Sequence, residues 1–167
     1  MSEAETDAEP AREDPAGEEL PGGFVSGALR VGDTVRRPPA SGPEFVRRLL
    51  RFLEQAGFAG APRLLGEDTD GREVLSFVSG YVPWRQGEAA QVRSAPSLTA
   101  AAALLRQFHD LTAGTALAGD SEVVCRNDLS PRNTIYRDLG AGLVPVAFID
   151  WHIAAPGARI HDVAAVG

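Results

Sequence analysis

The chain contains no lysine, because all 16 of its Lys or Arg positions are arginine. Arginine stays protonated and cannot serve as a Schiff-base amine or as a titrating base, so lysine-type covalent chemistry is excluded. Any contact between a basic side chain and a phosphate must therefore come from arginine. Its planar guanidinium can bind two phosphate oxygens at once.

Cysteine and long apolar runs are also scarce. Cys125 is the single cysteine, so an internal disulfide is impossible and a cytoplasmic location is favoured. The longest apolar runs fall well short of the ~20 residues of a membrane helix. The acidic N-terminus lacks the basic and apolar regions of a signal peptide. We therefore expect no membrane partner.

The net charge of −7 is concentrated at one end of the chain. Residues 1–19 contain eight acidic residues and one arginine, which accounts for the whole net charge. We expect this segment to be a disordered acidic tail, with docking on a partner as the alternative. The remainder is neutral, and it has no basic stripe of the kind that binds nucleic acid.

The first half of the chain predicts a β-rich region with one helix. Glycine turns divide residues 20–38 into three short strands. Apolar residues recur at helical spacing in residues 43–56, with Ser41 as the expected cap. Residues 64–78 then predict a hairpin, which Ser79-Gly80 and Pro83 end.

The second half predicts one long helix followed by three strands. The helix spans residues 97–112, and Ser97 is its expected cap. A short apolar strand over residues 123–125 precedes two strands, 134–137 and 143–149, that a glycine-containing turn connects. The pattern as a whole predicts an α+β fold.

Three polar residues form the most specific motif of the chain. Asp128 follows the strand 123–125, Asn133 lies five residues later, and Asp150 ends the last apolar strand. Because the intervening hairpin returns the chain, we expect Asn133 and Asp150 to lie side by side. Carboxylate and amide oxygens suit a hard cation such as Mg²⁺. A carboxylate in a loop can orient a hydroxyl group for attack on a phosphate. Ordinary turn hydrogen bonding is the alternative for Asp128 and Asn133.

This motif resembles the catalytic and metal-binding loops of the aminoglycoside phosphotransferase family. The run Ile149-Asp150-Trp151, followed by Ala154, Gly157 and Asp162-Val163-Ala164, is similar to a run in the same family. The closing part looks most like the bacterial branch that includes trifolitoxin-immunity-type proteins. The resemblance implies a protein-kinase-like fold with two lobes. It also implies transfer of the ATP γ-phosphate to a small-molecule hydroxyl with Mg²⁺, with Asp128 as catalytic residue and Asn133 and Asp150 as metal ligands.

The resemblance also implies roles in the first half of the chain. The turn containing Gly22, Gly23 and Ser26 would cover the phosphates. Arg36, or as a second choice Arg37, would stand where kinases have the third-strand lysine.

In the same resemblance, Glu44 in the following helix would form an ion pair with that arginine. Residues 76–79 would form the adenine-binding hinge. The boundary near Gly80 would separate an N-terminal nucleotide-binding lobe, residues 20–80, from a C-terminal lobe, residues 81–167.

The sequence departs from the family pattern in three places. Arg126-Asn127 replaces the usual His-Gly pair before the catalytic Asp128, and Asn127 is a residue that tolerates left-handed backbone. The chain also stops at Gly167, where family members continue, so we expect an incomplete C-terminal lobe. These departures leave open a truncated or non-catalytic relative that binds nucleotide, or an immunity-type binding protein. The acceptor and the oligomeric state stay open.

Several other polar residues are interpreted as structural. Asp162 is expected to bond backbone groups near the catalytic loop, and His109 to form a hydrogen bond from its helix. Cys125 is expected to be buried and inert. His152 and His161 share no metal-ligand spacing with the cysteine, which argues against zinc.

Overall fold

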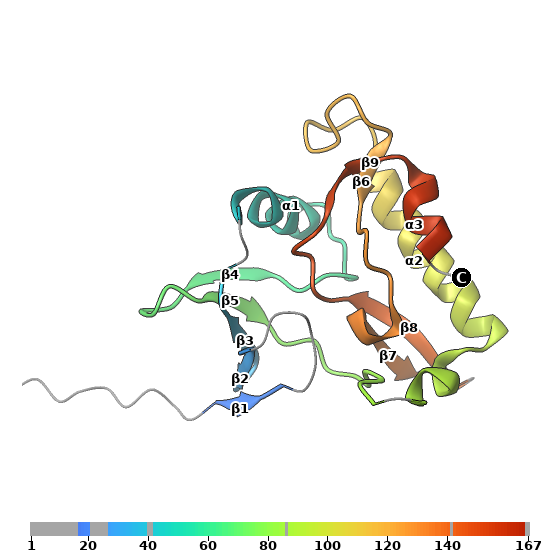
Figure 1. Cartoon of the computed structure of the whole chain (residues 1–167), viewed down its shortest axis with the longest axis horizontal. Coiled ribbons are helices and arrows are strands. Elements are labelled where there is room, and N and C mark those ends of the chain that lie inside the picture. The colour runs from blue at the N-terminus through green and yellow to red at the C-terminus, as the bar shows by residue number, and fades with distance from the viewer. Residues whose placement is uncertain (1–16, 21–26, 40–41, 86, 141, 166–167) are drawn as a thin grey trace, which may run out of the picture.

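The computed structural model describes residues 17–20, 27–39, 42–85, 87–140 and 142–165. Its N-terminal half forms a five-stranded antiparallel sheet with the order β1-β2-β3-β5-β4 (Figure 1). The strands are β1 (Glu18–Glu19), β2 (Leu29–Val31), β3 (Thr34–Arg37), β4 (Leu64–Glu67) and β5 (Glu73–Ser76). Strands β2 to β5 lie within the two segments, residues 20–38 and 64–78, in which the sequence predicts strands.

Strand β1 lies inside the segment that the composition assigns to a disordered tail. Glu18 is the register partner of Arg30, and Glu19 is the partner of Leu29. Opposite charges at facing positions stabilise an antiparallel pair, which favours Glu18 opposite Arg30. The tail prediction is therefore wrong for Glu18 and Glu19, and residues 1–16 lie outside the described residues.

Helix α1 (Glu44–Gln55) packs on this sheet through the apolar stripe that its sequence predicts. Its buried residues are Val46, Leu49, Leu50 and Leu53. The helix begins after Pro43, which makes no side-chain cap bond, and the predicted cap Ser41 lies outside the described residues.

The described part of the second half contains two α-helices, two 3₁₀ turns and two small sheets. Its helices are the 3₁₀ turns η1 (Glu88–Val92) and η2 (Pro131–Asn133), and the α-helices α2 (Ala95–Thr112) and α3 (Arg159–Ala165). Its strands are β6 (Val123–Cys125), β7 (Thr134–Asp138), β8 (Leu143–Phe148) and β9 (Ala155–Gly157), with β6 paired to β9 and β7 to β8. Helix α2 packs against β6 and β8, and α3 packs against β6 (Figure 1).

Helix α2 begins two residues earlier than its periodicity predicts. Ser94 is the cap, and its hydroxyl accepts a hydrogen bond from the Ser97 backbone at 3.2 Å. The prediction of Ser97 as the cap is wrong because Pro96 occupies the first turn, where its missing N–H costs nothing. Ser97 is instead buried within the helix.

One hydrophobic core joins the two halves of the chain. Leu50 and Leu75 from the first half belong to the same buried cluster as Phe108, Phe148 and Trp151 from the second. The backbone N–H of Phe148 also donates to the Gly60 carbonyl at 2.9 Å. The β7–β8 hairpin is therefore held at a defined position relative to the N-terminal sheet.

The segment that connects the two halves passes close to β7. Tyr81 and Tyr136 exchange both backbone hydrogen bonds at 2.8 Å. Gly80 has a φ of +155°, and a Cβ at this position would lie 2.3 Å from Ile135 Cγ2 and 2.7 Å from the Tyr136 carbonyl. Only glycine permits this approach. Among the described helices, none is both long enough and apolar enough to cross a membrane.

Candidate functional site

A cavity of 220 Å³ lies where β3 and β5 meet the β7–β8 hairpin. Its wall is largely apolar, and Arg37, Asn133 and Asp150 are polar side chains within it. Ser76, Phe77 and Val78 also line it, so the segment that the resemblance identifies as the hinge borders this cavity. A mostly apolar cleft with a few polar groups is typical of a small-molecule site.

The loop after β6 presents Asp128 to Asn133. The Asn133 amide Nδ2 donates to the Asp128 carboxylate at 2.6 Å. Asn133 is held by the η2 turn, in which its backbone N–H donates to the Ser130 carbonyl at 3.0 Å. Because the amide nitrogen is used by Asp128, the amide oxygen of Asn133 is the atom left to face a cation.

Asn133 and Asp150 lie side by side, as the returning hairpin predicts. Thr134 is the register partner of Phe148, and the Ile149 N–H donates to the Asn133 carbonyl at 2.9 Å. Both side chains line the same cavity.

Asp150 adopts a left-handed backbone conformation with a φ of 61°. A non-glycine residue in this region is uncommon, and such residues cluster at functional sites. Its Oδ1 lies 2.5 Å from His152 Nδ1 and 3.5 Å from Arg37 Nη1. The carboxylate of Asp150 therefore faces two nitrogen-bearing side chains from different elements.

Arg126 lies beneath this site and is completely buried. Its guanidinium carbon lies 4.3 Å from the centre of the Trp151 ring and 5.4 Å from that of Phe148. Its Nη2 donates to the backbone carbonyls of Asp128 at 3.0 Å and Ile149 at 2.8 Å. One side chain thus ties the loop of Asp128 to the loop of Asp150.

Burial lowers the pKa of Arg126 to about 10, and the negative charges of Asp150, Asp162 and Asp128 oppose that change. The side chain therefore remains a cation at neutral pH. It supplies a fixed positive charge among three carboxylates.

Asp162 anchors the loop that carries Asp128. Its carboxylate accepts hydrogen bonds from the backbone N–H of Arg126 at 2.7 Å and of Asn127 at 2.8 Å. The same carboxylate lies 2.9 Å from His109 Nε2 on α2. The structural roles predicted for Asp162 and His109 are confirmed. Asn127 has a φ of 63°, in the left-handed region that its residue type tolerates.

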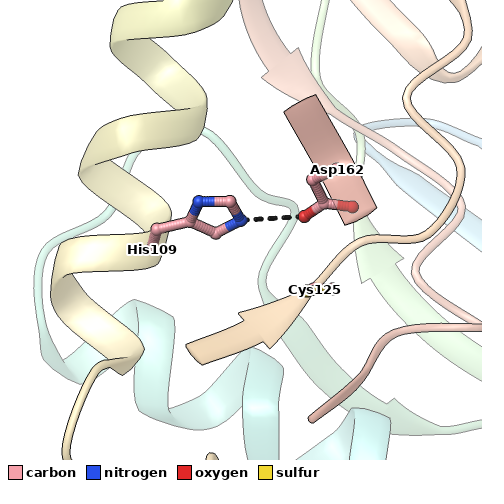
Figure 2. Close-up of side chains that lie close together, drawn as sticks. All are labelled: His109, Cys125 and Asp162. Carbon is pink, nitrogen blue, oxygen red and sulfur yellow. Dashed lines mark hydrogen bonds and ion pairs between the residues drawn. The ribbon is translucent and has the colours of Figure 1, made fainter. Parts of the chain in front are cut away.

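His109, Cys125 and Asp162 place their ligand atoms within 4.8 Å of one another. Figure 2 shows the His109 ring facing the Asp162 carboxylate. Each of these atoms already has a protein partner. Cys125 Sγ donates to the Ala158 carbonyl at 3.2 Å, and His109 and Asp162 are bonded to each other. Burial, with Asp162 and Glu122 nearby, raises the pKa of Cys125 to about 11. We interpret this cluster as a hydrogen-bonded anchor for the loop.

The structure brings Arg37, and not Arg36, to the cavity. Successive strand residues point to opposite faces of a sheet, so only one of the two can face the site. Arg37 lines the cavity, whereas Arg36 Nη1 lies 3.8 Å from the Asp68 carboxylate. The prediction that Arg36 stands at the position of the third-strand lysine is therefore corrected to Arg37.

Glu44 does not pair with the arginine of the site. It lies exposed in the first turn of α1. The carboxylate that bonds Arg37 is Glu73, whose Oε2 accepts from Arg37 Nε at 3.1 Å. Gly22, Gly23 and Ser26, predicted as the phosphate-covering turn, lie outside the described residues.

Sequence reasoning missed Glu73 and the positions of Arg126 and His152. A period-two pattern in Glu73-Val74-Leu75 places Glu73 on the same buried face as Leu75. A charged residue at an inward strand position was the available signal for Glu73. No comparable local signal marks Arg126, because its burial depends on rings from β8 and the loop that follows.

No protein-family model matches the chain. The trifolitoxin immunity protein of Rhizobium leguminosarum bv. trifolii is 33% identical over 157 aligned residues, covering 82% of this chain. The chain spans about half, 55%, of the length of that relative.

Solved structures resemble the chain over nearly its whole length. A GDP complex of aminoglycoside 2′-phosphotransferase-IIIa matches with a TM-score of 0.60 and 17% identity, covering 94% of this chain and 73% of that one. The GDP and kanamycin complex of APH(2″)-IIia gives a TM-score of 0.63 at 18% identity, with the same coverage.

A choline/ethanolamine kinase family protein from Mesorhizobium loti gives a TM-score of 0.59 at 15% identity, covering 93% of this chain and 64% of that one. At these identities the likeness concerns the fold. The chain has the two-lobe, protein-kinase-like fold of the aminoglycoside phosphotransferases.

Proposed function

We propose that this chain carries a phosphotransferase site that binds a nucleoside triphosphate with Mg²⁺ and transfers the γ-phosphate to a small-molecule hydroxyl. The supporting observation is the convergence of Arg37, Asn133 and Asp150 on one cavity, with Asp128 bonded to Asn133 at 2.6 Å. The fold shared with phosphotransferases is consistent with this chemistry.

The donor set fits a magnesium ion. Asp150 offers an anionic oxygen and Asn133 a neutral amide oxygen, and Mg²⁺ is commonly held by one or two such protein groups plus substrate phosphates. In this position Mg²⁺ would neutralise charge on the phosphates of the donor. The Asp150 carboxylate lies within reach of the Arg37 guanidinium and the His152 ring, so more than one protein group holds its position in the cavity.

Arg37 fits a role in holding the phosphates. Its Nε is bonded to Glu73 and its Nη1 faces Asp150. Its Nη2 is buried and has no hydrogen-bond partner among the described residues. A buried donor without an acceptor is costly, and a phosphate oxygen in the cavity would provide one.

Asp128 would orient the acceptor. Its carboxylate would accept a hydrogen bond from the substrate hydroxyl and receive the proton as the hydroxyl oxygen bonds to the γ-phosphorus. The bond from that phosphorus to the bridging oxygen of the nucleoside diphosphate breaks in the same step. Asn133 would hold the Asp128 carboxylate in place through the bond at 2.6 Å.

The donor base is proposed to lie against Ser76, Phe77 and Val78, which line the cavity. ATP is our first choice. The similar aminoglycoside phosphotransferase structures are GDP complexes, so GTP must be tested beside ATP.

A transfer assay tests this proposal. The chain is incubated with Mg²⁺ and ATP or GTP, and nucleoside diphosphate release is followed across a panel of hydroxyl-bearing compounds that includes kanamycin. We expect acceptor-dependent release that Asp128→Asn lowers by about a hundredfold or more. Absence of release with every acceptor and both nucleotides would contradict the transfer reaction.

The trifolitoxin immunity relative favours a second candidate function, protection against a toxin without phosphate transfer. Toxin-sensitive cells that express the chain or its Asp128→Asn variant separate the two functions. Protection by both proteins would support a binding role. Protection that is lost with Asp128 would support transfer.

A further inference from the structure

Glu73 links the arginine at the candidate phosphate site to helix α1. Its side chain is buried, and its Oε2 accepts from Arg37 Nε at 3.1 Å while its Oε1 accepts from Arg47 Nε at 2.9 Å. Glu73 and Arg37 are also register partners across β3 and β5. A single carboxylate therefore fixes two guanidinium groups, one from a strand and one from a helix.

The charges around Glu73 explain why it can be buried. A buried carboxylate without partners would be strongly unfavourable. Glu67 is its register partner on β4, and two like charges at facing positions would repel. Arg47 from α1 contacts both carboxylates, which offsets that repulsion. The helix therefore contributes a cation here, where the family resemblance implied an anion from Glu44.

The bond to Glu73 also sets the direction of Arg37. Because the guanidinium is rigid and planar, the bond from its Nε to Glu73 fixes the plane of the group and therefore the positions of both terminal nitrogens. Nη1 then lies 3.5 Å from Asp150, and Nη2 is the buried donor without a partner among the described residues. Without Glu73, Asp150 is the acidic partner that remains for Arg37.

We propose that Glu73 is the positioning residue of this site: it aims Arg37 at the nucleotide phosphates and connects that arginine to α1 through Arg47. This inference rests on the proposed nucleotide site. In it, Glu73 on β5 holds the phosphate-binding Arg37, and Arg47 on α1 holds Glu73. Loss of Glu73 releases Arg37 toward Asp150, which removes a phosphate contact and neutralises a candidate metal ligand.

A double-mutant cycle on nucleotide affinity tests the proposal. Calorimetric titrations use Mg²⁺ with ATP and with GTP, and the matching nucleosides, adenosine and guanosine, on the whole chain. The proteins are the wild type, Glu73→Gln, Arg37→Met and the double variant. Glu44→Gln is the matched control, because it removes an exposed carboxylate from α1.

We expect Glu73→Gln alone to weaken triphosphate binding about tenfold. Added to Arg37→Met, it should weaken binding less than about twofold, because Glu73 and Arg37 act as a unit. Nucleoside affinity should stay unchanged, which a general loss of structure would not allow. Glu44→Gln should bind like the wild type. Glu73→Asp keeps the charge but shortens the reach to both arginines, and it replaces Glu73→Gln if that variant does not fold.

Three results would overturn the proposal. If the wild type binds the triphosphate and Glu73→Gln binds it with the same affinity, Glu73 does not position Arg37. The proposed function would still stand. Equal losses for the triphosphate and the nucleoside would assign Glu73 to general stability. Failure of the wild type to bind either triphosphate would instead remove the proposed function, and this inference with it.

Discussion

The guanidinium carbon of Arg126 lies 4.3 Å from the centre of the Trp151 indole ring. This stacking holds a buried cation directly under the loops of Asp128 and Asp150, whose backbone it bonds through the carbonyls of Asp128 and Ile149. The two loops that supply the candidate catalytic and metal residues thus depend on one side chain.

Arg126→Met should destabilise the protein by about 3 kcal/mol, because the change leaves buried carbonyls and carboxylates without their cationic partner. Urea unfolding followed by circular dichroism measures the effect. The matched control is Arg93→Met, since Arg93 is exposed. If both variants unfold at the same urea concentration, Arg126 does not join the two loops as described.

Asp162 should make the protein sensitive to acid. Burial opposes its ionisation, but hydrogen bonds from His109 and from the backbone of Arg126 and Asn127 outweigh that effect and lower its pKa below the ordinary value. A carboxyl whose pKa is lower in the folded state contributes stability above its unfolded pKa of about 4. That contribution is lost as the pH falls through the folded pKa.

Asp162→Asn should remove this part of the acid dependence and cost about 3 kcal/mol at neutral pH. Unfolding free energies measured between neutral and acidic pH provide the test, with the exposed Asp120→Asn as control. An unchanged acid slope in Asp162→Asn would show that another group carries it.

Cys125 should not react with thiol reagents in the folded protein. Burial, with Asp162 and Glu122 nearby, raises its pKa to about 11, so the nucleophilic thiolate is scarce at pH 8. Labelling with a disulfide reagent should be slow in buffer and rapid in urea. Added Zn²⁺ should leave the melting temperature unchanged, because His109, Cys125 and Asp162 already have protein partners. Rapid native labelling, or a large Zn²⁺-dependent rise in melting temperature, would contradict the anchor interpretation.

Gly80→Ala should be more damaging than a typical glycine replacement. Its Cβ would meet Ile135 Cγ2 at 2.3 Å and the Tyr136 carbonyl at 2.7 Å. We expect a loss of about 2–4 kcal/mol, from overpacking added to backbone strain. Gly87→Ala is the control, because its φ of +90° imposes strain but no atom lies within 4 Å. Equal losses in chemical unfolding would show that the close approach to β7 contributes nothing.

The sequence predicts the local parts of the site well, for physical reasons. Asp128 and Asn133 share one short loop, and the hairpin between Asn133 and Asp150 leaves little freedom in where the second carboxylate can lie. The tolerance of Asn127 for left-handed backbone is likewise a property of its own side chain.

The long-range parts of the site are not predictable in the same way. Strand alternation places Arg36 and Arg37 on opposite faces, but the register of β3 with β5 decides which face meets the cavity. The contact between Glu73 and Arg47 depends on how α1 packs on the sheet. Strand β9 and helix α3 are too short to show a clear periodicity, and their order comes from contacts with β6. The lobe boundary near Gly80 stays a prediction.

Calorimetric titration of ATP and GTP with and without Mg²⁺, on the wild type and on Asp150→Asn, tests the central claim most directly. Our account predicts that Mg²⁺ strengthens triphosphate binding to the wild type and that Asp150→Asn loses most of this Mg²⁺-dependent gain, because Asp150 is the proposed anionic ligand. Equal binding by both proteins, or no binding of either triphosphate to the wild type, would contradict it.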